Sequence, residues 1–104
     1  MKPKRLVNRK LLREIKKKPC LVCLCPPGPF KLVDPSHLRS KGAGGPDTDW
    51  NVVPMCRECH RTWHDWGPVR FLSHYREFCL KLVRMGWEVN LETGKLFHPE
   101  MREI

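Results

Sequence analysis

The sequence predicts a small α+β fold in which short strands and helices are held together by a metal site. The chain has 104 residues, including 10 prolines and 7 glycines, so its core must be small and much of its middle must be loop. Two C-x-x-C pairs on either side of strand-forming residues indicate a metal site that adds stability. We expect one domain, organised as residues 1–19, 20–67 and 68–104.

The first predicted element is a helix over residues 8–17, with Asn8 as its N-cap. Its apolar positions form a narrow stripe among basic residues: Leu11, Leu12 and Ile15. Pro19 requires the helix to end before the proline-rich segment 20–29, which we expect to form a knuckle.

Two short strands are predicted in the middle of the chain. Residues 30–34 are rich in strand-forming side chains, and Pro35 is expected to close this strand. The second strand covers residues 52–53 and is expected to end at Pro54. Segment 39–49 between them contains three glycines, one proline and two aspartates, a composition typical of a long ordered loop.

Two helices and a hairpin are predicted after the second strand. A helix over residues 57–65 stops at Gly67, and a second covers residues 68–85 with Gly86 as its C-terminal cap. The apolar positions of the second helix recur at helical spacing: Phe71, Leu72, Tyr75, Phe78, Cys79, Leu82 and Val83. Residues 87–98 alternate around a glycine-containing turn and predict a small β-hairpin.

Several conspicuous side chains are expected to serve packing rather than chemistry. Cys79 lies on an apolar helical face and is expected to be a small buried hydrophobe. His74 lies at the edge of that face, and His98 is expected at the surface. The four tryptophans are expected to fill the core: Trp50, Trp63, Trp66 and Trp87.

Positive charge is concentrated at the N-terminus. The formal net charge is +9, and residues 1–18 supply most of it through nine lysines and arginines against one acid, Glu14. A local basic segment suits a polyanionic partner such as nucleic acid, although a solubilising tail is the alternative. The candidate phosphate contacts at its end are Lys16, Lys17 and Lys18.

The chain start lacks the apolar segment of a signal peptide, and no run approaches the roughly 18 apolar residues that span a membrane. Paired C-x-x-C motifs in the reducing cytosol bind metal more often than they form disulfides. We therefore expect a cytoplasmic protein with no membrane partner.

The cysteine spacing predicts one tetrahedral thiolate site for structural zinc. The favoured ligands are the two C-x-x-C pairs: Cys20, Cys23, Cys56 and Cys59. Cys25 offers a fifth thiolate and a C-x-C alternative. Because the pairs lie at the open ends of the predicted strand hairpin, one zinc ion can tie these ends together.

A second site is indicated beside the first. His60 and His64 are four residues apart, so they share one face of a helix and suit a divalent metal. His37 lies at the end of the first predicted strand. Asn51 lies across the glycine-rich loop, where its amide can bond to loop backbone groups and hold His37 in place.

These residues carry a resemblance to a known family. The stretch DPSHLRSKGAGGP (34–46), followed by NVVPMCRECH (51–60), resembles the HNH or ββα-metal endonucleases, most closely their small zinc-stapled phage and prophage members. The likeness covers residues 20–65. It implies a ββα-metal (HNH) core with a structural zinc, flanked by the basic N-terminal helix and the C-terminal helix and hairpin.

The resemblance also implies an activity, namely metal-dependent cleavage or nicking of DNA. The His–Asn–His set falls on His37, Asn51 and His60, and His64 matches a further metal ligand. His37 would act as the general base and Asn51 would orient it. The implied catalytic ion is Mg²⁺, Mn²⁺, Ni²⁺ or Zn²⁺, the products carry 5′-phosphates, and a phage context suggests packaging or recombination partners.

One position departs from the family pattern. Ser36 stands where an aspartate or histidine metal ligand usually precedes the general base, and Asp34 is the tentative replacement. The phosphate contacts expected around the site are Arg39, Lys41, Arg57 and Arg61. A non-catalytic zinc-stabilised nucleic-acid-binding module is the alternative function, and a protein-interaction zinc module is a third.

Overall fold

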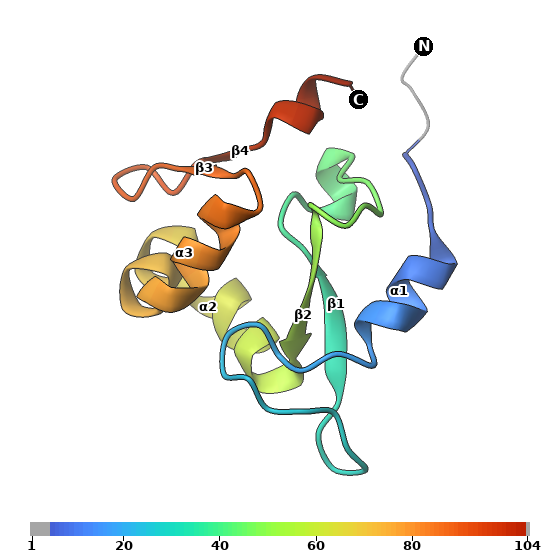
Figure 1. Ribbon diagram of the computed structural model, residues 1–104. Coiled ribbons are helices and arrows are strands. Elements are labelled where there is room, and N and C mark those ends of the chain that lie inside the picture. Colours follow the sequence, from blue (N-terminus) through green and yellow to red (C-terminus); the bar gives the residue numbers. More distant parts are fainter. Residues whose placement is uncertain (1–4, 104) are drawn as a thin grey trace.

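The computed structural model describes residues 5–103, and these form three α-helices and two small antiparallel sheets (Figure 1). The elements in chain order are α1 (Arg9–Ile15), β1 (Val33–His37), the 3-10 turn η1 (Lys41–Ala43), β2 (Val52–Cys56), α2 (Arg57–His74), α3 (Arg76–Arg84), β3 (Glu88–Val89), β4 (Leu96–Phe97) and the 3-10 helix η2 (Pro99–Glu103). The predicted α+β class is confirmed. The start of the predicted basic arm, residues 1–4, and residue 104 lie outside the described residues.

The central hairpin of β1 and β2 is longer than predicted because it runs through two prolines. Pro35 lies opposite Pro54 in the antiparallel register. The Pro54 carbonyl accepts a hydrogen bond from the backbone N–H of Leu21 at 2.8 Å, so it points away from β1. At such a position the backbone nitrogen also points outward, and proline loses no hydrogen bond of the sheet. The expectation that Pro35 and Pro54 end the strands was therefore wrong.

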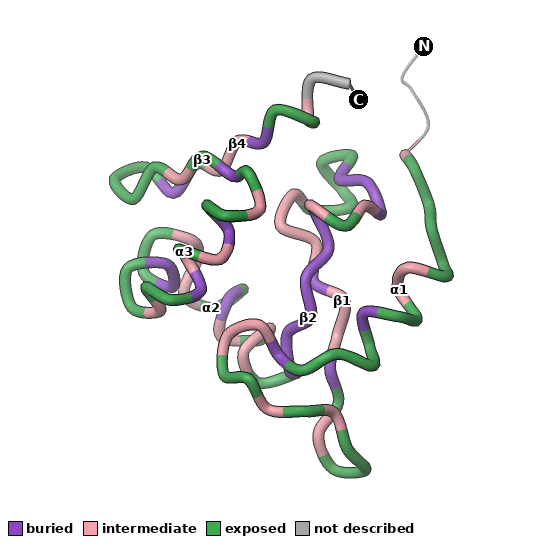
Figure 2. Tube along the Cα trace, in the orientation of Figure 1, coloured by how far each residue is buried: buried purple, intermediate pink, exposed green. Residues whose placement is uncertain are grey.

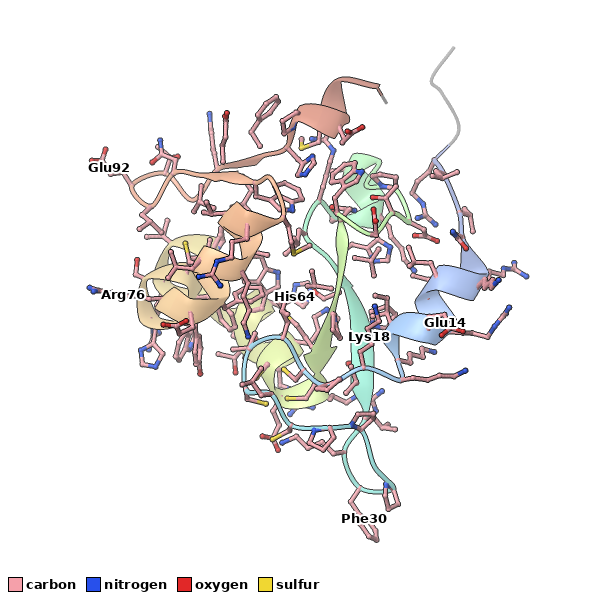
Figure 3. The ribbon with its side chains drawn as sticks, in the orientation of Figure 1. Glu14, Lys18, Phe30, His64, Arg76 and Glu92 are labelled. Carbon is pink, nitrogen blue, oxygen red and sulfur yellow. The ribbon has the colours of Figure 1, made fainter. Side chains whose placement is uncertain are left out.

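The first strand also begins later than predicted. The backbones of Gly28 and Lys31 exchange hydrogen bonds of 3.0 and 3.2 Å and close a tight turn before β1. Phe30 lies at the tip of this turn, where it is 100% exposed and projects away from the molecule (Figure 3). Residues 30–32 include strand-forming types, but the turn at 28–31 keeps them out of the strand, which starts at Val33.

Helices cover both faces of the central hairpin. α1 and α2 lie on opposite sides of it (Figure 1), and β2 is buried along its whole length (Figure 2). Side chains alternate between faces along a strand, so Val53 and Met55 face α2 while Val52 faces α1. Ile15, the buried residue of α1, seals the second face. This packing fixes β1 and the start of α2 against each other.

The main core is apolar and aromatic and joins β2, α2, α3 and the C-terminal segment. Its buried members are Val53, Met55, Trp63, Phe71, Leu72, Phe78, Leu82 and Trp87. Trp63 meets the rings of Phe71 and Phe78 edge-on. Trp50 and Trp66 pack against this cluster while partly buried, so the tryptophans serve packing as predicted.

The helical region after β2 is interrupted twice. Gly67 has φ 78° and ψ 167°, so the helix changes direction before Pro68, as predicted. Tyr75 has φ −101° and ψ 73°, and it divides the predicted continuous helix into the end of α2 and α3. With this interruption, the ring centroids of Tyr75 and Phe71 are 4.6 Å apart. The Tyr75 ring is also stacked on the ring of Trp66. Aromatic packing has overridden the helical periodicity.

α3 ends as the sequence predicts. Gly86 has φ 101°, its N–H donates to the carbonyl of Val83, and the N–H of Trp87 donates to that of Leu82. These two bonds form a Schellman motif, for which the left-handed glycine is required. The predicted hairpin follows as β3 paired with β4.

The C-terminal segment folds back onto the core through a residue that was expected at the surface. His98 is only 6% exposed, and its ring stacks on Trp50 with centroids 4.5 Å apart. Its Nε2 lies 2.9 Å from the carbonyl oxygen of Met85. The surface assignment of His98 was wrong, and the β3–β4 hairpin is consequently anchored beside the loop that follows β1.

Candidate functional site

The two C-x-x-C pairs converge, as predicted. Cys20 and Cys23 precede β1, Cys56 ends β2, and Cys59 lies in the first turn of α2. Their four Sγ atoms all lie within 4.8 Å of one another, and those of Cys23 and Cys56 are 3.8 Å apart. Thiolates placed tetrahedrally about 2.3 Å from a zinc ion stand about 3.8 Å from each other. The cluster can therefore coordinate a metal ion such as zinc.

The knuckle that carries the first pair is shaped by its backbone. The N–H of Leu24 donates to the carbonyl of Cys20, and the N–H of Cys20 donates to that of Cys25. Burial would raise the pKa of the Cys23 thiol, but hydrogen bonds from Cys25 and the neighbouring thiols outweigh it and lower this pKa to about 7. The lowered pKa favours the thiolate that a metal requires. Among residues 5–103, only the four paired cysteines converge in this way, and Cys25 is outside the group.

The two histidines of α2 face each other beside this cluster. The Nε2 atoms of His60 and His64 are 3.0 Å apart. Two nitrogens about 2.1 Å from one ion and 3.0 Å apart subtend about 90° at it, which suits a divalent cation with octahedral geometry. The same distance fits a hydrogen bond between the two rings. The pair thus offers two metal ligands that the helix already holds together.

Asp34 contacts His60 at Nδ1, the ring nitrogen that does not face His64. Its Oδ2 is 3.4 Å from Nδ1 of His60, and its Oδ1 accepts a hydrogen bond from Arg57 at 3.2 Å. Burial opposes ionisation of Asp34, but Arg57 and His60 outweigh it and lower the pKa of this carboxyl. A carboxylate on the far nitrogen of a histidine fixes the orientation of the ring. The geometry gives Asp34 this orienting position instead of the tentative place among the direct ligands.

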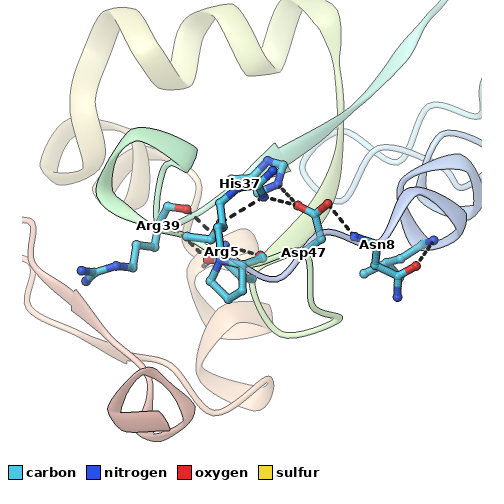
Figure 4. Close-up of polar contacts among 9 residues, drawn as sticks. Arg5, Asn8, His37, Arg39 and Asp47 are labelled. Atoms are coloured by element: carbon cyan, nitrogen blue, oxygen red, sulfur yellow. Dashed lines mark hydrogen bonds and ion pairs between the residues drawn. The ribbon is translucent and has the colours of Figure 1, made fainter. Parts of the chain in front are cut away.

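His37 at the end of β1 is held by a carboxylate that the sequence analysis did not select. Nε2 of His37 lies 2.7 Å from Oδ1 of Asp47, whose side chain is 0% exposed (Figure 4). The same carboxylate accepts hydrogen bonds from Arg5 at 2.7 Å and from the backbone N–H of Asn8 at 2.9 Å. Asp47 therefore joins the histidine to the N-terminal segment. Sequence reasoning counted Asp47 among the turn formers of segment 39–49.

The charge on Asp47 is secured by these partners. Burial would raise the pKa of this carboxyl, but the hydrogen bonds from His37, Asn8 and Arg5 lower it to about 2. A depressed pKa contributes stability at pH values above the unfolded value near 4, and this contribution disappears as the pH falls toward 2. Asp47 is consequently ionised around neutral pH, and Nε2 of His37 has a fixed partner. No hydrogen-bond partner for its Nδ1 is present among the described residues.

Asn51 holds the loop that follows His37, as its position predicts. The side chain is buried, its Oδ1 accepts from the backbone N–H of Arg39 at 2.8 Å, and its Nδ2 donates to the carbonyls of Arg39 and Pro46. Every polar atom of this amide is bonded to loop backbone. The amide therefore fixes the loop at Arg39 and at Pro46, which directly precedes Asp47.

Ser36 is fully buried on β1, and its hydroxyl has no hydrogen-bond partner among the described residues. Strand alternation places it on the same face as Asp34, which contacts His60 of α2. A buried hydroxyl without a partner carries a free-energy cost and calls for an explanation. It is compatible with a polar group between β1 and α2, although a hydroxyl is a weak ligand for a divalent ion.

An open cavity of about 390 Å³ is lined by both His37 and His64. His37 and Arg39 line it from β1 and the following loop, and His64 lines it from α2. The C-terminal segment also lines it, through Leu96 and Met101. His37 and His64 are 27 positions apart in the chain, and the fold brings both to the lining of one cavity.

The predicted phosphate contacts differ in their surroundings. Arg39 donates from Nε to the carbonyl of Ala43, and Arg57 is paired with Asp34. The remaining ones are exposed: Lys16, Lys17, Lys18, Lys41 and Arg61. Among residues 5–103, no helix is sufficiently long and apolar to cross a membrane.

Comparisons of the chain with protein-family models, with curated proteins and with solved structures give no match. The function must therefore be argued from the residues and their geometry.

Proposed function

We propose that this protein is a metal-dependent DNA endonuclease or nickase built on a zinc-stapled ββα-metal (HNH) core. One observation carries the proposal: His37 from β1 and His64 from α2 line the same cavity. Asp47 holds Nε2 of His37, and the Nε2 atoms of His60 and His64 lie 3.0 Å apart, which suits two ligands of one ion. A base and a metal-ligand histidine that line one cavity suit hydrolysis of a phosphodiester bound there.

In this proposal His37 is the general base. Asp47 occupies Nε2, which leaves Nδ1 to accept the proton of the attacking water. His60 and His64 would hold a divalent ion, which would supply positive charge for the phosphate oxygens and the leaving 3′ oxygen. Asp34 orients His60 through Nδ1, and Asn51 keeps the loop after His37 in place.

The bound nucleic acid would be held mainly by positive side chains around this cavity. Arg39 lies in its wall, and the exposed lysines after α1 add a local positive field. Contacts of this kind bind phosphates without reading sequence. Such phosphate contacts are expected in a nuclease and in a non-catalytic binding protein, so they do not distinguish the two functions.

A non-catalytic zinc-stabilised nucleic-acid-binding module is the second candidate, and two observations favour it. Ser36 presents a hydroxyl where a metal ligand is expected, and Asp34 bonds to the far nitrogen of His60. Such a protein would keep the zinc cluster and the basic surface but would not cut.

The decisive experiment is incubation with supercoiled plasmid in a series of Mg²⁺, Mn²⁺, Ni²⁺ and Zn²⁺. We expect nicked or linear DNA, and we expect His64→Ala to reduce cutting at least tenfold because one of the two metal ligands is lost. His74→Ala is the matched control, since His74 lies on the same helix and is exposed. If the plasmid stays intact with every metal, the endonuclease proposal is wrong. The non-catalytic nucleic-acid-binding module is then the favoured function.

The lysines after α1 are expected to set the salt dependence of DNA binding. Changing Lys16, Lys17 and Lys18 together to glutamine should lower affinity and reduce the slope of log K against log salt by up to about 3. The control removes the same charge from exposed C-terminal positions: Arg76, Arg84 and Lys95. Fluorescence anisotropy with a labelled duplex measures both. An unchanged slope in the lysine variant would show that these residues only solubilise the chain.

A further inference from the structure

We propose that the cavity beside His37 and His64 is a subsite for an unstacked nucleobase, so that the preferred ligand is DNA containing unpaired nucleotides. This inference names the substrate class for the endonuclease proposed above and rests on it for the chemistry. The binding preference itself can be measured without cleavage.

The walls of the cavity have two different characters. Its lining includes His37, His64 and Arg39, which suit a phosphate. The remaining wall is mainly apolar and includes Leu38, Pro68 and Leu96. A phosphate gains nothing from apolar walls, whereas a flat nucleobase next to that phosphate can fill them.

A paired duplex cannot use such a cavity well. Its bases are stacked inside the helix, and it presents sugars and phosphates to a protein surface. Proteins that bind a base in a pocket act on single strands or remove the base from the stack, and this costs least where the base is already unpaired. The cavity of about 390 Å³ is in the size range of small-ligand pockets. Its volume and lining thus favour an unpaired nucleotide.

The apolar wall is firmly attached to the rest of the fold. A Cβ added at Gly94 would lie 2.9 Å from Cγ2 of Val69 and 3.0 Å from Cγ of Pro68, so this hairpin turn rests directly on α2. Further along the chain, Leu96 packs against the core and His98 is stacked on Trp50. A wall held at two points is preorganised for a ligand and does not need to be ordered by it.

The test compares binding of three labelled DNAs with the same length and salt: a perfect duplex, a duplex with two unpaired nucleotides, and a single strand. Anisotropy is measured with the full chain and no added divalent metal. We expect the two DNAs with unpaired bases to bind about tenfold tighter than the duplex, the effect of one additional base contact. Equal binding of all three would overturn the proposal.

Two pairs of variants locate the preference. Leu96→Glu places a charge in the cavity, and Leu91→Glu places the same charge on an exposed position of the same hairpin. Ala43→Trp fills the cavity from its exposed rim without altering the core, and Gly42→Trp adds the same bulk at an open neighbouring position outside the cavity lining.

The subsite predicts that Leu96→Glu and Ala43→Trp each lose the preference for unpaired DNA and that both controls keep it. If the preference survives in Ala43→Trp, the subsite lies elsewhere and the inference is wrong. A protein that shows this preference but cuts no plasmid with any metal would retain the subsite while the endonuclease proposal fails. The two proposals are thus separated by one binding and one cleavage measurement.

Discussion

Replacing Cys59 with serine is expected to release the bound metal and to unfold the protein at room temperature. The four thiols converge from the knuckle before β1 and from the junction of β2 and α2, so a metal ion held by them would tie the knuckle to the hairpin and the helix. Structural zinc contributes about 10 kcal/mol or more to folding in small domains, which is comparable with the whole stability of a chain this size. Loss of one thiolate removes most of that contribution.

The measurements are zinc content per chain and the thermal unfolding curve followed by circular dichroism. We expect about one zinc in the wild type and almost none in Cys59→Ser, together with loss of the cooperative transition. Cys25→Ser is the matched control because Cys25 lies in the same knuckle but outside the converging group. Loss of zinc in Cys25→Ser and its retention in Cys59→Ser would mean that Cys25 is the fourth ligand.

Metal binding by the four cysteines should also respond to acid in a defined direction. Burial, together with the neighbouring thiols, raises the pKa of Cys59 in the metal-free protein. A group with a raised pKa must release a proton when the metal binds, so affinity falls as the pH falls. A chelator competition repeated at several pH values gives this dependence. The direction follows from the cysteines alone and holds whether or not the protein cuts DNA.

The order of secondary-structure elements and the thiolate cluster were accessible from the sequence because both depend on local signals. The N-cap at Asn8, the left-handed cap at Gly86 and the C-x-x-C spacing each act within a few residues. Strand ends were less accessible. Whether Pro54 ends a strand depends on which way its nitrogen points, and that is set by the register with Pro35.

Apart from Asn51, the residues that hold the candidate site in place could not be identified from the sequence. Asp47 resembles any turn-forming aspartate until the fold buries it beside His37 and Arg5, which are 10 and 42 positions away. No spacing rule links such partners, because the loop length between them is free to vary. His98 was misplaced for a similar reason, since its stacking on Trp50 is a long-range contact.

Asp47→Asn is expected to reduce cleavage by about 10- to 1,000-fold while zinc content and DNA affinity stay close to wild type. The carboxylate holds Nε2 of His37 and, if His37 is the proposed base, would stabilise the positive ring that forms when Nδ1 accepts a proton. An amide can keep one hydrogen bond but not the charge. His37→Ala removes the base itself and should lose about 10²- to 10⁴-fold.

Several readouts separate this positioning role from a purely structural one. Asp49→Asn removes the same charge from an exposed position in the same loop and should cut normally. The Asp47→Asn variant should also change the pH–rate profile, because the charge beside the titrating imidazole is gone. Combining it with His37→Ala should add little further loss, since both changes act through one group.

The N-terminal segment also contacts Asp47. Arg5 donates to the same oxygen of Asp47 that holds His37, and the Asn8 N–H binds the other oxygen. Removing the Arg5 charge in Arg5→Gln should therefore lower cleavage in the same direction as Asp47→Asn, by a smaller factor, while Arg9→Gln on exposed α1 should not. If Asp47→Asn instead abolishes zinc binding or cooperative unfolding, Asp47 supports the fold alone. His37 would then require another source of orientation.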